Sequence, residues 1–358
     1  MYDMPITRLE SRKIHQNYKR TAEVASLEYV NDSMPGIVRQ RKGTGFSFTI
    51  QNAVVRDKEI LARIKRLVIP PAWTNVWICL RSNGHIQVTG YDVRGRKQYK
   101  YHEQWNVIRN QTKFHRLYEF GKELPKLRKR LDEDIHKPQL TKEKVLATVV
   151  SLMERTFIRV GNSEYEKLYG SYGLTTLKDG HVNITGATMK FSFKGKKGIF
   201  HTITLKNKKL AKIVKACRDI PGKELFQYIN DEGVRCSIDS GMVNGYIQET
   251  TAKDFSAKDF RTWAGTLSML SSFKSLGDAS TQADTKKNII LALDEVSSKL
   301  GNTRTICKKY YVHPEIIKLY EEHNLQKYLD QLDDLETDDE ISGLTQEEEV
   351  LMKILKKI

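Results

Sequence analysis

The sequence lacks long hydrophobic runs and has few cysteines. No apolar stretch approaches the roughly 20 residues that a membrane-spanning helix needs, and the opening segment MYDMPITRLESRKIHQ has no apolar signal-peptide core. The four cysteines include no C-x-x-C pair, which argues against a disulfide framework and a structural zinc site. We therefore expect a cytoplasmic protein without membrane contact, whose thiols are reduced and mostly buried: Cys79, Cys217, Cys236 and Cys307.

The motifs of several common enzymes are also missing. The sequence contains no G-x-x-x-x-G-K-[ST] phosphate loop, no H-E-x-x-H pair and no G-x-S-x-G elbow. The segment GTGFSF lacks the third glycine of a dinucleotide-binding turn. These absences disfavour ATP use and tightly bound zinc, so we expect no cofactor, no nucleotide and no metal.

Positive charge is the first informative feature that is present. The formal net charge is +16, although residues 331–349 hold nine acids and no lysine or arginine, so the rest of the chain is more positive still. Such a surface suits a polyanion, most simply nucleic acid bound through phosphate contacts. The alternative is a surface charge that serves solubility alone. We interpret the acidic segment as a solvated helix and linker.

The chain of 358 residues exceeds one usual domain, so two folded units are expected. Residues 36–101 have a strand-like pattern: GTGFSFTI alternates, and VWICLRSNGHIQVTG suggests two strands around an Asn83-Gly84 turn. The helical pattern EILARIKRL is stopped by IPPAW. Residues 1–105 are therefore predicted to form a small β-rich domain.

Residues 106–330 have mainly helical patterns, as in LYEFGKELPKLRKRLDEDI and TKEKVLATVVSLMERTFIRV. MKFSFKGKKGIFHTITL predicts a β-hairpin with a basic tip, and SAKDFRTW predicts a helix start capped by Ser256 and Asp259. KKNIILALDEVSSKLG predicts a helix that Gly301 ends. The fold class is therefore α+β, with a larger helical domain and an acidic tail or helix at 331–358.

A basic protein without cofactor motifs can still act on a phosphodiester through side chains. A tyrosine that attacks DNA phosphorus needs cations to offset the growing charge and a proton donor for the leaving oxygen. Arginine suits the first task, because its planar fork binds two phosphate oxygens and stays charged. Lysine can serve the second when its site lowers its pKa. None of these residue types is rare, so this inventory alone decides nothing.

The order of several segments carries a more specific signal. ERTFIRVGNSEY is followed by YGLTTLKDGHV, FKGKKG, SAKDFRTWAGT and LGNT, and a tyrosine stands nine positions after the asparagine. This series resembles the type IB DNA topoisomerases of the poxvirus-like and bacterial class. GIVRQRKGTGFSF, RIKRLVIPPAWTNVWI and GHIQVTGYDVRGRKQYKYH resemble the small β domain of that family. The resemblance covers roughly residues 36–325.

The resemblance implies a set of catalytic residues. Arg159 in FIRVG matches the first phosphate-binding arginine, and Arg261 in KDFRTW matches the second. Without the flanking motifs, each would be interpreted as a surface arginine. Lys196 matches the general acid that protonates the 5′-oxygen, although Lys194 and Lys197 at the same tip leave the alternative of a phosphate-touching loop open.

Asn302 stands where poxvirus members and tyrosine recombinases have a histidine. Its amide can donate a hydrogen bond to a phosphate oxygen, but it cannot supply a charge or exchange a proton. The local pattern leaves the nucleophile open, because Tyr310 and Tyr311 could each face the core of a short helix. The family spacing of nine residues from Asn302 selects Tyr311 and leaves Tyr310 as the packing residue.

RGRKQYKY resembles the segment with which the family touches DNA. Arginines suit phosphates or guanine edges, whereas glutamine and tyrosine can hydrogen-bond to base edges or the backbone. On local pattern alone, the two tyrosines of this segment could equally be core aromatics. The resemblance therefore implies these DNA contacts: Arg94, Arg96, Gln98, Tyr99, Tyr101 and, in the second domain, Tyr165.

As a whole, the resemblance implies a monomer whose two lobes clamp double-stranded DNA, and which would be associated with the nucleoid if bacterial. The tyrosine forms a 3′-phosphotyrosyl link, the broken strand rotates, and the 5′-hydroxyl rejoins it without ATP or an obligatory metal. Two alternatives stay open. A tyrosine recombinase shares the Arg-Lys-Arg-Tyr chemistry, and a non-catalytic DNA-binding protein shares the charge.

Overall fold

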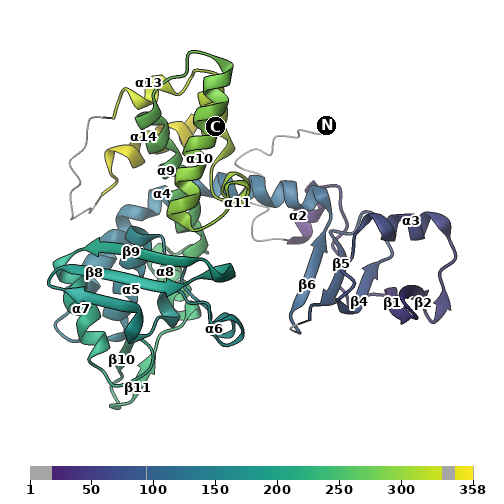
Figure 1. Ribbon diagram of the computed structural model, residues 1–358, viewed down its shortest axis with the longest axis horizontal. Helices are drawn as coiled ribbons and strands as arrows, with labels where there is room; N and C mark the ends of the chain where they lie inside the picture. The colour runs from purple at the N-terminus through teal and green to yellow at the C-terminus, as the bar shows by residue number, and fades with distance from the viewer. Residues whose placement is uncertain (1–17, 94, 333–342, 358) are drawn as a thin grey trace. The chain divides into compact units, whose positions relative to one another are not determined.

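A computed structural model of the chain describes residues 18–93, 95–332 and 343–357. The chain divides into two compact units, residues 1–116 and residues 117–358. The helix α4 (Glu103–Ile135) contains this division, and it begins close to the predicted boundary at residue 105. Each unit is described by itself below, with its elements labelled as in Figure 1.

The first unit is built on a six-stranded antiparallel sheet in the order β3-β2-β1-β4-β5-β6. The strands expected from the alternating patterns are present, and residues 80–85 connect β4 to β5 through a loop that contains Asn83 and Gly84. The elements of this unit are α2 (Tyr18–Val24), β1 (Gly36–Lys42), β2 (Gly45–Ile50), β3 (Ala53–Val54), α3 (Lys58–Arg66), β4 (Thr74–Cys79), β5 (Ile86–Tyr91) and β6 (Lys97–Tyr101).

One helix and one face of the sheet form a core in this unit. The side chain of Asp57 caps α3 by accepting hydrogen bonds from the backbone N–H groups of Glu59 and Ile60, at 2.8 and 3.1 Å. Ile64 of α3 packs against Ile37 and Ile78 of the strands, and all three are buried. The helix predicted from EILARIKRL therefore anchors the sheet through its apolar face.

The second unit is mainly helical. α5 (Lys142–Thr156) is its most buried helix, and α7 (Lys208–Arg218) and α5 pack against a three-stranded sheet in the order β7-β8-β9. Its remaining elements are α6 (Ser163–Tyr169), β7 (Val182–Thr185), β8 (Thr188–Lys194), β9 (Phe200–Lys206), β10 (Gln227–Ile229), β11 (Arg235–Ser237), α8 (Ser240–Thr251), α9 (Ala257–Leu276), α10 (Gln282–Leu300), α11 (Arg304–Tyr310), α12 (Pro314–Glu321), α13 (Gln326–Leu329) and α14 (Gln346–Lys357). The α+β fold class is confirmed, with the helical unit the larger of the two.

Two local predictions in this unit are also confirmed. β8 and β9 lie side by side as the expected hairpin (Figure 1), and Lys196 and Lys197 stand in its turn. Ser256 caps α9, because the Asp259 carboxylate accepts hydrogen bonds from the backbone N–H and the hydroxyl of Ser256, at 2.9 and 3.0 Å. Gly301 ends α10 with a left-handed φ of 56°, a conformation that glycine adopts readily.

The C-terminal segment departs from the prediction of a solvated helix. α14 has an apolar stripe that packs on α9, with Val350, Leu351 and Ile354 at most 1% exposed. Glu348 is also buried, because its carboxylate pairs with Arg128. The acids at 333–340 lie outside the described residues. The acidic composition of the tail gave no indication of the amphipathic helix α14, whose apolar face completes the core of the second unit.

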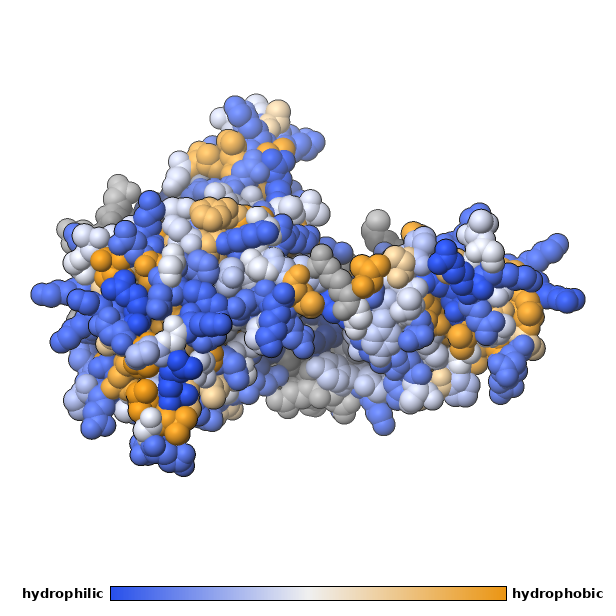
Figure 2. All heavy atoms as spheres, turned by 60° about the horizontal axis from the view of Figure 1, so that its bottom comes forward, coloured by the Kyte–Doolittle hydropathy of each residue, from blue (hydrophilic) through white to orange (hydrophobic). Residues whose placement is uncertain are grey.

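The surface and the cysteines follow the composition. On the face that Figure 2 shows, hydrophilic side chains predominate and hydrophobic ones form scattered groups. Within the described ranges, no helix combines the length and the apolar content that crossing a membrane requires. All four cysteines are free thiols, and three of them are buried.

Candidate active site

The end of α5 places the first predicted arginine. Phe157 caps this helix in the left-handed region, with φ of 56°, so the chain turns away immediately before Arg159. Arg159 Nη2 then donates hydrogen bonds to the Asn302 Oδ1 atom at 2.7 Å and to the Gly301 carbonyl at 3.1 Å. The loop after α5 is thereby joined to the segment between α10 and α11, so two residues 143 positions apart in the sequence meet.

The second arginine joins the same two segments. Arg261 lies in the first turns of α9 and is only 6% exposed. Its Nη1 donates to the Phe157 carbonyl at 2.5 Å, and its Nη2 donates to the Leu300 carbonyl at 2.7 Å. The Nε atom of Arg261 is buried and has no hydrogen-bond partner among the residues that the structure describes. Arg261 is therefore not the solvent-facing charge that its helix pattern alone suggests.

The Arg261 guanidinium is buried and the nearby Arg159 guanidinium is half-buried, and no carboxylate of the described residues pairs with either. Burial, together with the nearby charge of Arg261, lowers the pKa of Arg159 to about 10. Burial also lowers the pKa of Arg261, and an interaction with the Tyr311 side chain partly opposes this shift. Two cations that share one buried site favour an anion between or beside them.

Tyr311 lies directly beside Arg261. The Arg261 Cζ atom is 5.1 Å from the centroid of the Tyr311 ring, within the range of a cation–π contact. α11 ends at Tyr310, and the Tyr311 N–H donates to the Cys307 carbonyl at 2.9 Å. Thr303 caps the start of α11, so Asn302 lies before this helix and Tyr311 lies at its end. The chain therefore changes direction between the two residues, which allows both to lie near Arg159 and Arg261.

The backbone of Tyr311 is held against α9 by two neighbouring residues of that helix. A Cβ atom built on Gly265 would lie 2.6 Å from the Tyr311 carbonyl oxygen and 2.9 Å from its Cβ. The Thr266 hydroxyl accepts a hydrogen bond from the backbone N–H of His313 at 3.1 Å. Gly265 lies one helical turn beyond Arg261. One face of α9 therefore supplies both an arginine and the glycine against which the tyrosine backbone packs.

The neighbouring tyrosine has a different setting. Tyr310 is half-buried, and the Lys309 ammonium lies 5.4 Å from its ring centroid. Tyr311, in contrast, packs against the main core cluster of the second unit. The close approach at Gly265 brings Tyr311 onto α9, so Tyr311 also packs, and the expectation that Tyr310 is the packing tyrosine stays a prediction.

The hairpin tip carries Lys196 on an exposed turn. The Gly195 N–H donates to the Ile199 carbonyl at 2.7 Å, and Lys197 adopts a positive φ of 62°, so the turn is tight. The Lys196 ammonium lies 5.8 Å from the ring centroid of Tyr165 on α6. The structure thus joins two predicted residues, Lys196 and Tyr165, and separately gathers Arg159, Arg261, Asn302 and Tyr311.

The predicted DNA-contacting residues of the first unit lie on β6 and the turn before it. The Asp92 carboxylate accepts hydrogen bonds from Arg96 Nε at 2.8 Å and from Gln98 Nε2 at 3.0 Å, which orients both side chains. Tyr99 and Tyr101 are 44% and 40% exposed, and their rings stack with centroids 5.9 Å apart. They are therefore surface rather than core aromatics. Arg94 lies outside the described residues.

Two residues near the catalytic cluster were missed by the sequence analysis. His201 on β9 contacts the backbone of Gly301, and Gly265 seats Tyr311. An isolated glycine inside a helical pattern often marks a close packing contact, so Gly265 could have been singled out. A histidine within an alternating strand carries no comparable signal.

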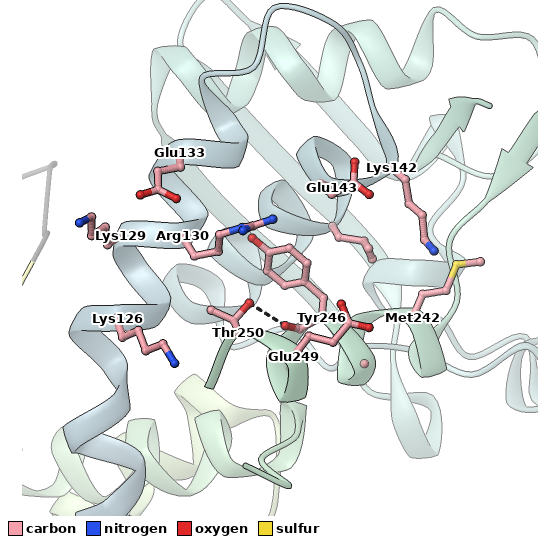
Figure 3. Close-up of a pocket in the computed structure, with 12 residues that line it drawn as sticks. Lys126, Lys129, Arg130, Glu133, Lys142, Glu143, Met242, Tyr246, Glu249 and Thr250 are labelled. Carbon is pink, nitrogen blue, oxygen red and sulfur yellow. Dashed lines mark hydrogen bonds between the residues drawn. The ribbon is translucent and has the colours of Figure 1, made fainter. Parts of the chain in front are cut away.

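A separate hollow of about 570 Å³ lies between α4, α5 and α8. Figure 3 shows its lining, to which α4 contributes three basic side chains and the acidic Glu133, and Tyr246 of α8 lies across from them. Its charges are largely matched, because the buried Asp134 carboxylate accepts hydrogen bonds from Arg130 at 2.7 Å and from the Tyr246 hydroxyl at 2.8 Å. None of the predicted site residues lines this hollow.

The described residues contain no group of three or more histidine, cysteine, aspartate or glutamate side chains placed to hold a metal ion. The cluster of Arg159, Arg261, Asn302 and Tyr311 consists instead of guanidinium, amide and phenol groups. These groups suit an oxyanion, since arginine and amide N–H groups donate and the phenol oxygen can act as a nucleophile.

The comparisons with known proteins agree with this chemistry. Residues 99–338 match the family described as the catalytic core of eukaryotic DNA topoisomerase I, and residues 45–92 match the N-terminal domain of bacterial DNA topoisomerase IB. DNA topoisomerase 1B of Acanthamoeba polyphaga mimivirus is 34% identical over 299 residues, which cover 80% of this chain and 88% of the viral protein. DNA topoisomerase 1B of vaccinia virus (strain Copenhagen) is 26% identical over 243 residues, covering 66% of this chain and 72% of its own length.

The two-unit α+β fold and these matches define an enzyme of the isomerase class. More closely, the chain belongs to the type IB DNA topoisomerases and is poxvirus-like in sequence.

Proposed function

We propose that the chain relaxes supercoiled double-stranded DNA by cutting and rejoining one strand through Tyr311. The observation that carries this proposal is a pair of arginines, the half-buried Arg159 and the buried Arg261, which lie beside a tyrosine and form hydrogen bonds to neutral acceptors. A scissile phosphate supplies the negative charge that suits this pair. Neither a nucleotide nor an obligatory metal is part of the reaction.

The first step is an attack by the Tyr311 hydroxyl oxygen on phosphorus. A P–O bond to the phenol forms while the P–O5′ bond breaks, and the phenol proton passes to water. Arg159 and Arg261 donate hydrogen bonds to the nonbridging oxygens, and their charges stabilise the pentavalent transition state. The Asn302 amide lies beside Arg159 and donates a further hydrogen bond to the same phosphate. The product is a 3′-phosphotyrosyl link.

Lys196 donates the proton that the 5′-oxygen needs as it leaves. The exposed tip of the β8–β9 hairpin can approach the DNA backbone, and Lys194 and Lys197 on the same turn add positive charge near phosphates. The broken strand then rotates about the intact one, and the 5′-hydroxyl attacks the phosphotyrosine to restore the strand. Because the phosphodiester energy is kept in the covalent bond, no energy source is consumed.

The first unit supplies the larger part of the DNA grip. Tyr99 and Tyr101 offer two exposed, stacked rings on β6, and Asp92 orients Gln98 of the same strand and Arg96 of the turn before it. These side chains are proposed to contact phosphates and base edges, together with Arg94 and, in the second unit, Tyr165. The protein acts as a monomer that clamps duplex DNA between its two units.

Relaxation of supercoiled plasmid in EDTA without ATP tests this proposal. The wild type should relax the plasmid, and Tyr311→Phe should abolish relaxation because the nucleophilic oxygen is lost. Tyr310→Phe is the matched control, since it removes the same atom from the adjacent residue and should retain activity. A second assay uses a DNA substrate whose short 5′-hydroxyl fragment dissociates after cleavage, so that the 3′-phosphotyrosyl adduct cannot rejoin. On a denaturing gel, the wild type and Tyr310→Phe should form this covalent adduct, and Tyr311→Phe should not.

Two outcomes would contradict the proposal. If the wild type bound DNA without relaxing it, the chain would be a DNA-binding protein without this activity. If Tyr310→Phe lost the adduct while Tyr311→Phe kept it, the nucleophile would be Tyr310.

A further inference from the structure

The imidazole ring of His201 fills a space between two glycines. His201 lies on β9 opposite Phe193 of β8, and the two rings stack with centroids 5.2 Å apart. A Cβ atom built on Gly195 would lie 2.5 Å from the imidazole Cδ2 atom, and one built on Gly301 would overlap the Cε1 atom. The ring therefore touches two backbone segments that have no room for a side chain of their own.

These two glycines belong to different parts of the catalytic machinery. Gly195 opens the tight turn that carries Lys196. The carbonyl of Gly301 accepts a hydrogen bond from Arg159, and Gly301 directly precedes Asn302. His201 is thus the spacer between the lysine-bearing turn and the loop that holds the arginine and the asparagine.

We propose that His201 is a positioning residue that sets the distance from the Lys196 turn to the Arg159–Asn302 loop. The inference rests on the proposed function of Lys196 as the proton donor. His201 acts by its shape: the flat ring, held by Phe193, keeps the two glycine backbones at a fixed separation.

The electrostatic surroundings agree with a role based on shape. Burial lowers the pKa of His201 below its ordinary value of 6.5, and the charges of Arg159 and Arg261 lower it further. Lys299 lines the same small hollow as His201 and adds another positive charge. A ring surrounded by these cations stays neutral at neutral pH, so it fills the space without adding charge to the phosphate site.

The two sides of the spacer differ in how firmly they are held. Gly301 is fixed by the end of α10 and by Arg159, whereas residues 196–200 at the hairpin tip are exposed. Loss of the ring should therefore displace the tip first. The expected defect is poor delivery of the Lys196 proton to the leaving 5′-oxygen.

A substrate with sulfur in place of the bridging 5′-oxygen isolates this step. On ordinary DNA the departing oxygen takes a proton from Lys196, but a thiolate is a stable anion and leaves without one. His201→Ala should slow single-turnover cleavage of ordinary DNA about 10- to 100-fold, the range expected for a small misplacement of a catalytic group. The same variant should cleave the sulfur-containing DNA at the wild-type rate.

Two further variants separate shape from chemistry. His201→Phe keeps a flat ring on Phe193 and removes both nitrogens, so it should recover most of the rate that His201→Ala loses. Thr204→Ala is the matched control, because Thr204 is an exposed residue of the same strand that does not line the hollows around His201. If His201→Phe were as slow as His201→Ala, the nitrogens would be required and the spacer role would be wrong.

Overpacking the same space gives an independent test. Gly195→Ala adds a methyl group where the ring lies, and the backbone φ of −91° at Gly195 allows alanine. This variant should also be slow on ordinary DNA. The double variant Gly195→Ala/His201→Ala should be faster than the product of the two single effects predicts, since removing the ring makes room for the methyl group. Strictly multiplicative effects would contradict the spacer.

Lys196→Ala in the same assays distinguishes this inference from the proposed function. If Lys196→Ala is not rescued by the sulfur-containing DNA, Lys196 is not the proton donor and the proposed function needs revision. If Lys196→Ala is rescued and His201→Ala either cleaves ordinary DNA normally or is not rescued, the positioning role of His201 alone is wrong.

Discussion

Two buried arginines of the second unit, Arg128 and Arg261, have opposite surroundings. Arg128 is 7% exposed and Arg261 is 6% exposed. Arg128 donates to the Glu154 carboxylate at 2.9 Å through Nε and to the Glu348 carboxylate at 2.7 Å through Nη1 and Nη2. Arg261 donates to the carbonyls of Phe157 and Leu300, which carry no charge.

The difference is visible in the direction of each pKa shift. Burial lowers the pKa of Arg128, but the carboxylates of Glu154 and Glu348 outweigh burial, so the pKa is raised. Burial dominates at Arg261 and lowers its pKa. A buried charge that is fully paired contributes to the folded structure, whereas a buried charge without a counterion favours binding of an anion. The comparison separates an arginine that holds helices together from one that is ready for a phosphate.

The largest expected effect is on the paired arginine. Arg128→Met leaves the Glu154 and Glu348 carboxylates without their cation, and breaking a buried pair in this way costs about 3–5 kcal/mol. We expect a correspondingly lower free energy of unfolding in urea. Arg128 joins α4 to α5 and α14, and Glu348 also accepts a hydrogen bond from Trp263 of α9 at 2.9 Å. An unchanged urea midpoint would show that these helices do not depend on the pair.

The same substitution at the unpaired arginine should affect the cleavage rate more than the stability. Arg261→Met removes the proposed transition-state donor, and loss of one such donor typically slows the chemical step about 10²- to 10³-fold. Because it leaves two carbonyls without a donor but no unpaired carboxylate, its urea midpoint should fall less than that of Arg128→Met. Single-turnover cleavage and urea unfolding of the two methionine variants test both halves of the comparison. A strongly destabilised Arg261→Met protein would mean that Arg261 is also a structural residue.

The sequence predicted most of the fold because local signals and tertiary packing agree. The strand expected from GTGFSFTI, the Ser256 cap and the Gly301 helix end are all present in the structure. The order of short motifs also selected four residues that the fold brings together: Arg159, Arg261, Asn302 and Tyr311.

What the sequence hid depends on contacts between distant segments. In the sequence, Glu348 is one of several acids in an acidic tail. Its role becomes clear only in the structure, where it pairs with Arg128, 220 positions away. The role of His201 depends on two glycines that approach it from different elements. The packing of Tyr311 against α9 depends on Gly265 of that helix. Composition and periodicity do not predict these tertiary contacts.

The contact between Gly265 and Tyr311, the proposed nucleophile, offers a smaller and more selective test. Gly265→Ala places a methyl group against the Tyr311 carbonyl and Cβ, so the tyrosine must move away from Arg261. We expect cleavage about 10-fold slower or worse, because small displacements of reacting groups are costly. Gly245→Ala on α8 is the matched control, since a Cβ there meets no atom within 4 Å. That control should leave cleavage unchanged and raise stability by about 0.5–1 kcal/mol, through helix propensity.

The smallest effect concerns acid stability and returns to the paired arginine. Burial raises the pKa of Glu348, but its hydrogen bond and ion pair with Arg128 outweigh burial, so the folded pKa lies below the ordinary value of 4.5. The folded protein then binds fewer protons than the unfolded chain as pH falls through 4.5. The contribution of Glu348 to stability is therefore complete above that pH and is lost progressively below it.

Urea unfolding between pH 6 and pH 3 tests this contribution. The free energy of unfolding should fall less steeply with pH in Glu348→Gln than in the wild type. Because Arg261 pairs with no carboxylate in the described structure, Arg261→Met should keep the wild-type slope. A shallower slope in Arg261→Met would reveal a titrating partner and remove the contrast between the two arginines.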